Sequence, residues 1–127
     1  MADRKRILVA DDDPDLIELL KMDLTLQGYD ILLANNGKDA LQMAMSEKVD
    51  LILLDVMMPY IDGYHVAYEV TSKLGAAAPK ILLITSRDTN REKGIALMSG
   101  AAEVLQKPFE MDRLHAKIIE LLGKPQP

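Results

Sequence analysis

Acidic side chains follow two apolar segments of the chain, at the point where each segment ends. Three consecutive aspartates at 11–13 come directly after the apolar run 7–10, and Asp55 closes the apolar run 51–54. Such runs are typical of fully buried strands, and ligands of open parallel sheets bind beyond the carboxyl ends of the strands. Carboxylates gathered there repel one another, and a hard cation with oxygen ligands, such as Mg²⁺, relieves that repulsion. The pattern therefore predicts a metal-binding acidic site at one edge of a sheet.

Two further polar side chains follow later apolar segments. Thr85 ends the run 81–84, and Lys107 comes shortly after the run 102–105. Each has a plain structural explanation by itself, as a strand-end hydroxyl or a surface lysine. Beside carboxylates the pair suits a phosphoryl group, because lysine binds phosphate as a point charge. An aspartate can also attack phosphorus to give an aspartyl phosphate, so the set predicts a nucleophilic carboxylate within an anion and metal site.

These side chains need strands and helices to position them. The strands that we expect are the apolar runs 7–10, 31–34, 51–54, 81–84 and 102–105. Helices are expected from Asp13 to Gly28, from Asn36, and at 63–74, 89–99 and 111–122, because aspartate and asparagine are good N-caps and glycine often ends a helix. The inner faces predicted by apolar spacing are Leu16, Leu20 and Leu24; Ala40, Leu41 and Ala44; Val66, Ala67 and Val70; Ile95 and Met98; and Leu114, Ile118, Leu121 and Leu122.

The alternation of strands and helices predicts an α/β fold. Right-handed crossovers give a parallel sheet, and five strands with helices on both faces fit the flavodoxin-like order 2-1-3-4-5. With 127 residues the chain can form one hydrophobic core. We expect one domain over residues 1–123, followed by a tail or the start of a linker at 124–127.

Composition limits the classes of function. The sequence has no cysteine, which excludes thiolate catalysis and zinc-thiolate sites and fits a reducing cytoplasm. The formal net charge of −5 argues against direct nucleic-acid binding. No apolar stretch has the length of a membrane span, and the charged start lacks the pattern of a cleavable signal. We therefore expect a cytoplasmic domain that contacts neither membrane nor nucleic acid.

In order and spacing, these residues resemble the receiver domain of response regulators in two-component signalling. The resemblance covers essentially the whole chain. No single motif is specific, whereas the ordered set in a chain of this size is highly specific. The matching stretches are 7–13, 55–59 with Asp62 and Gly63, Thr85 with Ser86, Gly100 with Ala101, and 107–109.

The resemblance implies roles for the acidic residues. Asp55 would be the phosphoacceptor and would share a Mg²⁺ ion with other ligands. Asp12 would ligate the ion directly, with Asp11 helping through water or at its edge. The backbone carbonyl of Met57 would be a further ligand.

The resemblance also implies how the phosphoryl group is held. Thr85 would hydrogen-bond the group once it arrives, and Lys107 would pair with its oxygens. In this family the peptide bond before Pro108 is cis. The chain would catalyse its own phosphorylation and dephosphorylation without being a conventional enzyme.

The same resemblance implies partners. The phosphoryl donor would be a phosphohistidine on a sensor histidine kinase or on a histidine phosphotransfer protein. The output would go to an effector domain or a downstream protein, so phosphorylation would act as a signalling switch.

Three positions depart from the family pattern. Val104 stands where an aromatic residue usually couples to threonine movement, so that coupling cannot operate in its ordinary form. Met57 stands where a polar side chain is common, and Tyr60 where glycine is common. Arg87, near the mouth of the site, is expected either to touch phosphate or to face water.

Other functions remain open at this point. A pseudo-receiver that signals by protein contact without phosphate is favoured by Val104 and disfavoured by the intact set of Asp12, Asp55, Thr85 and Lys107. An aspartate-nucleophile phosphatase needs a second aspartate two positions after the first, and the stretch 55–57 lacks it. Neither a glycine- and hydroxyl-rich loop for FMN nor a nucleotide P-loop is present.

Overall fold

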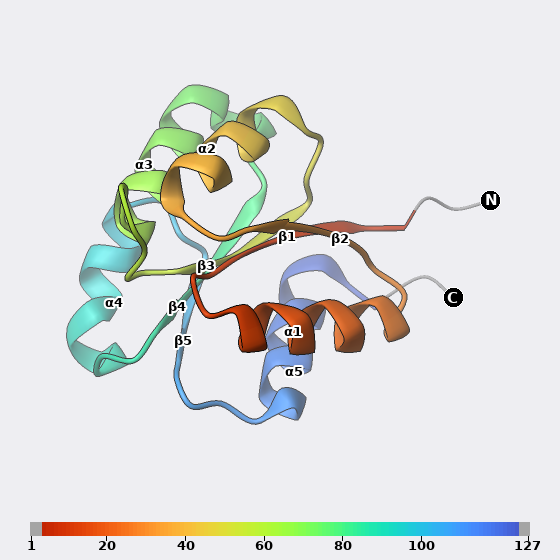
Figure 1. Ribbon diagram of the computed structural model, residues 1–127. Coiled ribbons are helices and arrows are strands. Elements are labelled where there is room, and N and C mark those ends of the chain that lie inside the picture. The colour runs from red at the N-terminus through yellow and green to blue at the C-terminus, as the bar shows by residue number, and fades with distance from the viewer. Residues whose placement is uncertain (1–3, 125–127) are drawn as a thin grey trace.

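The structure is a computed structural model that describes residues 4–124, in which strands and helices alternate (Figure 1). The strands are β1 (Arg6–Ala10), β2 (Asp30–Ala34), β3 (Leu51–Asp55), β4 (Lys80–Thr85) and β5 (Glu103–Gln106). The helices are α1 (Pro14–Leu26), α2 (Gly37–Ser46), α3 (Gly63–Leu74), α4 (Thr89–Met98) and α5 (Met111–Leu122), with a short 3₁₀ turn at Gly75–Ala77. The tail predicted at 124–127 lies outside the described residues except for Lys124.

The strands form one parallel sheet of five in the order β2-β1-β3-β4-β5, which confirms the predicted fold. β3 lies in the middle and is buried throughout. Its continuous apolar run reflects contact with helices on both of its faces. This central position places Asp55, the last residue of β3, inside the row of strand ends rather than at the rim of the sheet.

Two hydrophobic clusters separate the helices into layers (Figure 1). On one face α2, α3 and α4 pack against the sheet through small and branched side chains such as Ala40, Val66 and Ala96. On the other face α1 and α5 pack through Leu20 and Leu114 and lie side by side in the figure. The core is therefore two sheet–helix interfaces that share the same five strands.

Polar N-cap residues lie at the starts of α1 and α2, close to the carboxyl ends of the strands. The Asp13 side chain accepts the backbone N–H groups of Asp15 and Leu16 at the start of α1, as predicted. Asn36 caps α2 in the same way by accepting the N–H of Asp39 at 2.8 Å. Side-chain oxygens at N-caps satisfy backbone donors that lack partners within the helix. Asp13 is thus occupied as a cap, and Asp11 and Asp12 are left for the sheet edge.

The predicted inner face of α4 is wrong. Ile95 and Met98 are 49% and 85% exposed, and the buried positions in α4 are Glu92 and Ala96. The small Ala96 packs within the α2–α3–α4 cluster. The hydroxyl of Tyr64 in α3 donates to the Glu92 carboxylate at 2.7 Å, which makes burial of an acidic residue possible. In α1 the buried positions are Ile17, Leu20 and Leu24, and the predicted Leu16 is half-buried.

Among residues 4–124, every helix is too short or too polar to cross a membrane.

Candidate functional site

The register of the sheet gathers the predicted site residues at one edge. Ala10 pairs with Leu54, so Asp11 follows β1 beside Asp55 at the end of β3. On the other side, Thr85 at the end of β4 pairs with Gln106, so Lys107 follows β5 at the same level. Parallel strands all present their carboxyl ends at this edge. Four strands therefore supply the site.

Three carboxylates form an acidic cluster. One oxygen each from Asp11, Asp12 and Asp55 lies within 4.8 Å of the others. Asp11 and Asp55 are buried, at 2% and 5% exposure, whereas Asp12 is exposed. Asp11 is oriented by the backbone N–H of Asp13, which donates to its Oδ1 at 2.9 Å. The cluster thus has a fixed buried side and a side open to solvent.

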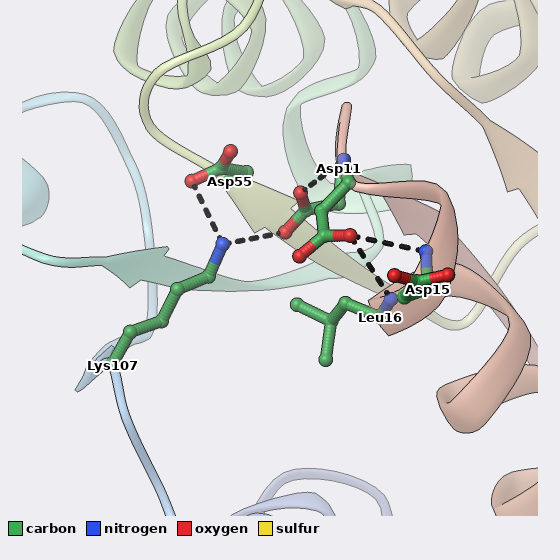
Figure 2. Close-up of polar contacts among 6 residues, drawn as sticks. Asp11, Asp15, Leu16, Asp55 and Lys107 are labelled. Atoms are coloured by element: carbon green, nitrogen blue, oxygen red, sulfur yellow. Dashed lines mark hydrogen bonds and ion pairs between the residues drawn. The ribbon is translucent and has the colours of Figure 1, made fainter.

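Lys107 supplies the positive charge that pairs with this acidic cluster. Its Nζ lies 2.8 Å from Oδ2 of Asp11 and 3.6 Å from Oδ1 of Asp55, pointing between the two carboxylates in Figure 2. Burial alone lowers the pKa of Lys107, but the hydrogen bond and charge of Asp11, with the charge of Asp55, raise it above its ordinary value. The ammonium is therefore charged at neutral pH.

Asp55 has the most perturbed carboxyl of the cluster. Burial and the negative charge of Asp11 raise the pKa of Asp55 to about 6, although the charge of Lys107 and the backbone N–H of Met57 lower it. Above that pH the carboxylate is ionised, and its raised pKa makes it more basic than an ordinary aspartate. Asp55 lies at the carboxyl edge of the sheet, beside the solvent-exposed Asp12. A basic carboxylate there is suited to attack an electrophile that arrives from solvent.

The donor set fits Mg²⁺. Hard divalent cations prefer carboxylate oxygens and keep several waters, and here two buried carboxylates and one exposed carboxylate converge. Within residues 4–124, the Lys107 ammonium is the one cation paired with these three acidic groups, so the cluster keeps an excess of negative charge for a cation. Asp11, Asp12 and Asp55 are therefore the residues that would hold the ion.

Thr85 and Arg87 form the wall of the site after β4. Thr85 is fully buried, and its Oγ1 accepts the backbone N–H of Arg87 at 3.0 Å. The Arg87 guanidinium contacts two groups: Nη2 lies 3.6 Å from Sδ of Met57, and Nη1 lies 3.5 Å from Oε1 of Glu92. Arg87 is thus exposed but not free, because it bridges the loop after β3 and the start of α4.

The remaining positions that depart from the family pattern have distinct surroundings. Val104 is buried at 7% exposure and helps to line a hollow of about 110 Å³ between α4 and β5. Tyr60 is 83% exposed and has a φ of 73°, a conformation that favours glycine. The peptide bond between Lys107 and Pro108 is cis, as the resemblance implies.

Sequence reasoning missed Glu92 and Tyr64. A signal was present, since Glu92, Ala96 and Ser99 are spaced as one face of a helix and all three are buried. A search restricted to apolar residues passes over this face, because two of its three members are polar.

The sequence of the chain is similar to those of known proteins of one family. A family model described as the response regulator receiver domain matches residues 7–119. The response regulator MprA of Mycobacterium leprae (strain TN) is 41% identical over 122 residues, which cover 96% of this chain and 53% of that protein. The alkaline phosphatase synthesis transcriptional regulatory protein PhoP of Bacillus subtilis (strain 168) is 35% identical, with coverage of 96% and 50%. The chain spans about half the length of these curated relatives.

Solved structures agree with the fold. The response regulator TrrA of Thermotoga maritima, in complex with Mg²⁺ and BeF, superposes with a TM-score of 0.83 at 41% identity, covering 93% of this chain and 99% of that one. The chemotaxis protein CheY4 of Vibrio cholerae gives a TM-score of 0.87 at 26% identity, with coverage of 94% and 100%.

Proposed function

The chain belongs to the family of response-regulator receiver domains, and from that premise we propose that it is a signalling switch phosphorylated on Asp55. One observation carries the assignment of the acceptor. Asp55 is a buried carboxylate at the end of the central strand, with the Lys107 ammonium 3.6 Å from one of its oxygens. The carboxylates of Asp11 and Asp12 lie beside it. The acceptor thus has both a positive charge and a metal-binding set around it.

The chemistry is transfer of a phosphoryl group. An oxygen of Asp55 forms a bond to phosphorus while the bond from phosphorus to the donor breaks, and the donor leaves with its electron pair. The loose transition state spreads negative charge over the equatorial oxygens. Lys107 stabilises that charge by its ammonium, and Thr85 provides a hydroxyl for the transferred group.

Mg²⁺ would be held by Asp11, Asp12 and Asp55, with the backbone carbonyl of Met57 as a further ligand. When bound, it supplies positive charge to the phosphoryl oxygens. The residues of the chain hold the geometry: the backbone N–H of Asp13 orients Asp11, and the Lys107 ammonium pairs with both Asp11 and Asp55. The arrangement at the edge is therefore largely formed before the donor arrives.

The partners follow from the family. The donor is a sensor histidine kinase or a histidine phosphotransfer protein, and the output passes to an effector domain or a downstream protein. The names of the relatives, a response regulator and a transcriptional regulatory protein, support this proposal, as does their greater length. Residues 1–123 would be the receiver domain, with a tail or linker beginning at 124, in a cytoplasmic protein.

Mass spectrometry tests the acceptor directly. The protein is incubated with Mg²⁺ and acetyl phosphate, and we expect a mass gain of one phosphoryl group that Asp55→Asn abolishes. Asp30→Asn is the matched control, because Asp30 is an exposed aspartate at the opposite end of β2. Labelling that persists in Asp55→Asn would remove the assignment. A wild-type protein that acquires no label from acetyl phosphate or from a phosphorylated kinase would instead be a phosphate-independent interaction module.

A further inference from the structure

A buried acidic residue lies outside the phosphoacceptor cluster. Glu92 in α4 is 7% exposed, and its Oε1 receives both the Tyr64 hydroxyl at 2.7 Å and the Arg87 Nη1 at 3.5 Å. Removing a carboxylate from water costs free energy unless partners compensate for the lost hydration. Glu92 therefore relies on both contacts, one neutral and one charged.

Arg87 also contacts a residue of the loop that follows the phosphoacceptor. Its Nη2 lies 3.6 Å from Sδ of Met57, two residues after Asp55. Its own backbone N–H donates to Thr85 Oγ1 at 3.0 Å. A thioether is only a weak acceptor. The Nη2 group thus has only a weak acceptor among these contacts, while Nη1 is held by Glu92.

We propose that Arg87 is a phosphoryl-binding residue with two alternative anionic partners: Glu92 before phosphorylation, and the phosphoryl oxygens once Asp55 is phosphorylated. This inference rests on the proposed function. Guanidinium groups bind phosphoryl oxygens through paired, parallel hydrogen bonds, whereas Arg87 contacts Glu92 through one nitrogen at 3.5 Å. The phosphoryl group is the stronger competitor, and Glu92 weakens its binding by holding Arg87 away.

The competition couples the site to α4. When Arg87 moves to the phosphoryl group, the buried Glu92 carboxylate keeps only the Tyr64 hydroxyl. Within α4 the only other buried residue is Ala96, so the start of α4 loses a substantial part of its attachment to the domain. Val104 is a stiff β-branched residue and cannot swing a ring between two positions. In this chain, movement of Arg87 takes the role of a conformational signal.

Binding of beryllofluoride with Mg²⁺, a mimic of the phosphoryl group, tests the competition by calorimetric titration. Glu92→Gln keeps an acceptor for Tyr64 but removes the attraction for Arg87, so we expect roughly two- to fivefold tighter binding, the range of a partly exposed ion pair. Tyr64→Phe leaves Glu92 with Arg87 alone, and binding should become weaker. Opposite signs for two neighbouring variants are not expected if the cluster only stabilises the fold.

A double-mutant comparison completes the test. In an Arg87→Ala background, Glu92→Gln should no longer change beryllofluoride affinity, because the shared partner is absent. Glu69→Gln is the control for loss of a negative charge, since Glu69 pairs with Lys73 on α3. Two results would overturn the competition alone, provided that beryllofluoride binding still depends on Asp55. In one, Glu92→Gln has the same effect with and without Arg87; in the other, Glu92→Gln has no effect. Binding that persists in Asp55→Asn would overturn the proposed function itself.

Discussion

Asp55 is buried, yet its carboxyl must be ionised to act as a nucleophile. Burial and the charge of Asp11 raise its pKa to about 6, so the folded protein binds a proton there more tightly than the unfolded chain does. By linkage, the stability contributed by this group is fully present at low pH and is lost as the pH rises from about 4 through the folded pKa of about 6. At neutral pH without a divalent cation, the ionised acceptor therefore lowers the free energy of unfolding.

Asp55→Asn should remove this cost. Without divalent cations at about pH 7, we expect the variant to be more stable than the wild type by about 1–3 kcal/mol, because one unit of pKa shift corresponds to about 1.4 kcal/mol. The difference should become small at about pH 3, where the Asp55 carboxyl of the wild type is mostly neutral in both the folded and the unfolded protein. Urea unfolding at the two pH values measures it. An equal stability difference at both values would show that Asp55 is not the group responsible.

Met57 is the second residue with a specific consequence. Its side chain is 54% exposed and contacts Arg87 beside the acceptor, where a polar side chain could hold the water that hydrolyses an acyl phosphate. We expect Met57→Asn to lose its phosphoryl group faster than the wild type, by up to about tenfold, which corresponds to about 1.4 kcal/mol in the barrier. Phosphate release from purified phosphoprotein in excess Mg²⁺ gives the rates. An equal or slower rate in the variant would contradict shielding by Met57.

At the scale of elements, the sheet was predicted correctly, whereas the inner face of α4 was not. Buried parallel strands carry continuous apolar runs, so all five strands and the shared edge of Asp55 and Lys107 follow from the sequence. The inward face of α4 depends on Glu92, which is buried because Tyr64, 28 positions away, donates a hydrogen bond to it. Sequence periodicity contains no information about such a partner. The Arg87 contacts were unpredictable for the same reason.

The conformational response should lie in the loop after β4 and in α4. Beryllofluoride with Mg²⁺ should change amide hydrogen exchange after Thr85 and within 89–98, because Arg87 connects the site to Glu92. The strand around Val104 should change little, since a β-branched side chain is restricted in χ1. Exchange measured by mass spectrometry with and without the mimic distinguishes the regions. A large change confined to β5, with a quiet loop after Thr85, would be the opposite result.

The start of α3 approaches the acceptor strand closely. A Cβ at Gly63 would lie 2.4 Å from the backbone oxygen of Asp55 and 2.9 Å from Cα of Val56, so Gly63→Ala should destabilise the fold by about 1–3 kcal/mol through overpacking. Gly94→Ala is the control, because Gly94 lies within α4 and a Cβ there meets no atom within 4 Å. It should stabilise the protein by up to about 1 kcal/mol. Chemical denaturation measures both; equal effects would refute the close approach.

At the scale of the whole molecule, cation binding should report on the folded state. The carboxylates of the cluster come from the loop after β1 and from the end of β3, so the unfolded chain has no such site. At a Mg²⁺ concentration about tenfold above its dissociation constant, we expect stabilisation by about 1.4 kcal/mol. Asp12→Ala should lose this gain, whereas Asp30→Ala should retain it. Thermal unfolding with and without Mg²⁺ measures this stabilisation. Stabilisation by Mg²⁺ that persists in Asp12→Ala would exclude Asp12 as a ligand.

The ion pair between Asp11 and Lys107 joins residues 96 positions apart. During synthesis on a ribosome, the acidic residues leave the exit tunnel long before the lysine does. A nascent chain that has exposed β1 to β3 already carries every carboxylate of the site, yet it lacks both the ammonium and the last strand. We therefore expect the acceptor to become competent only after nearly the entire domain has emerged.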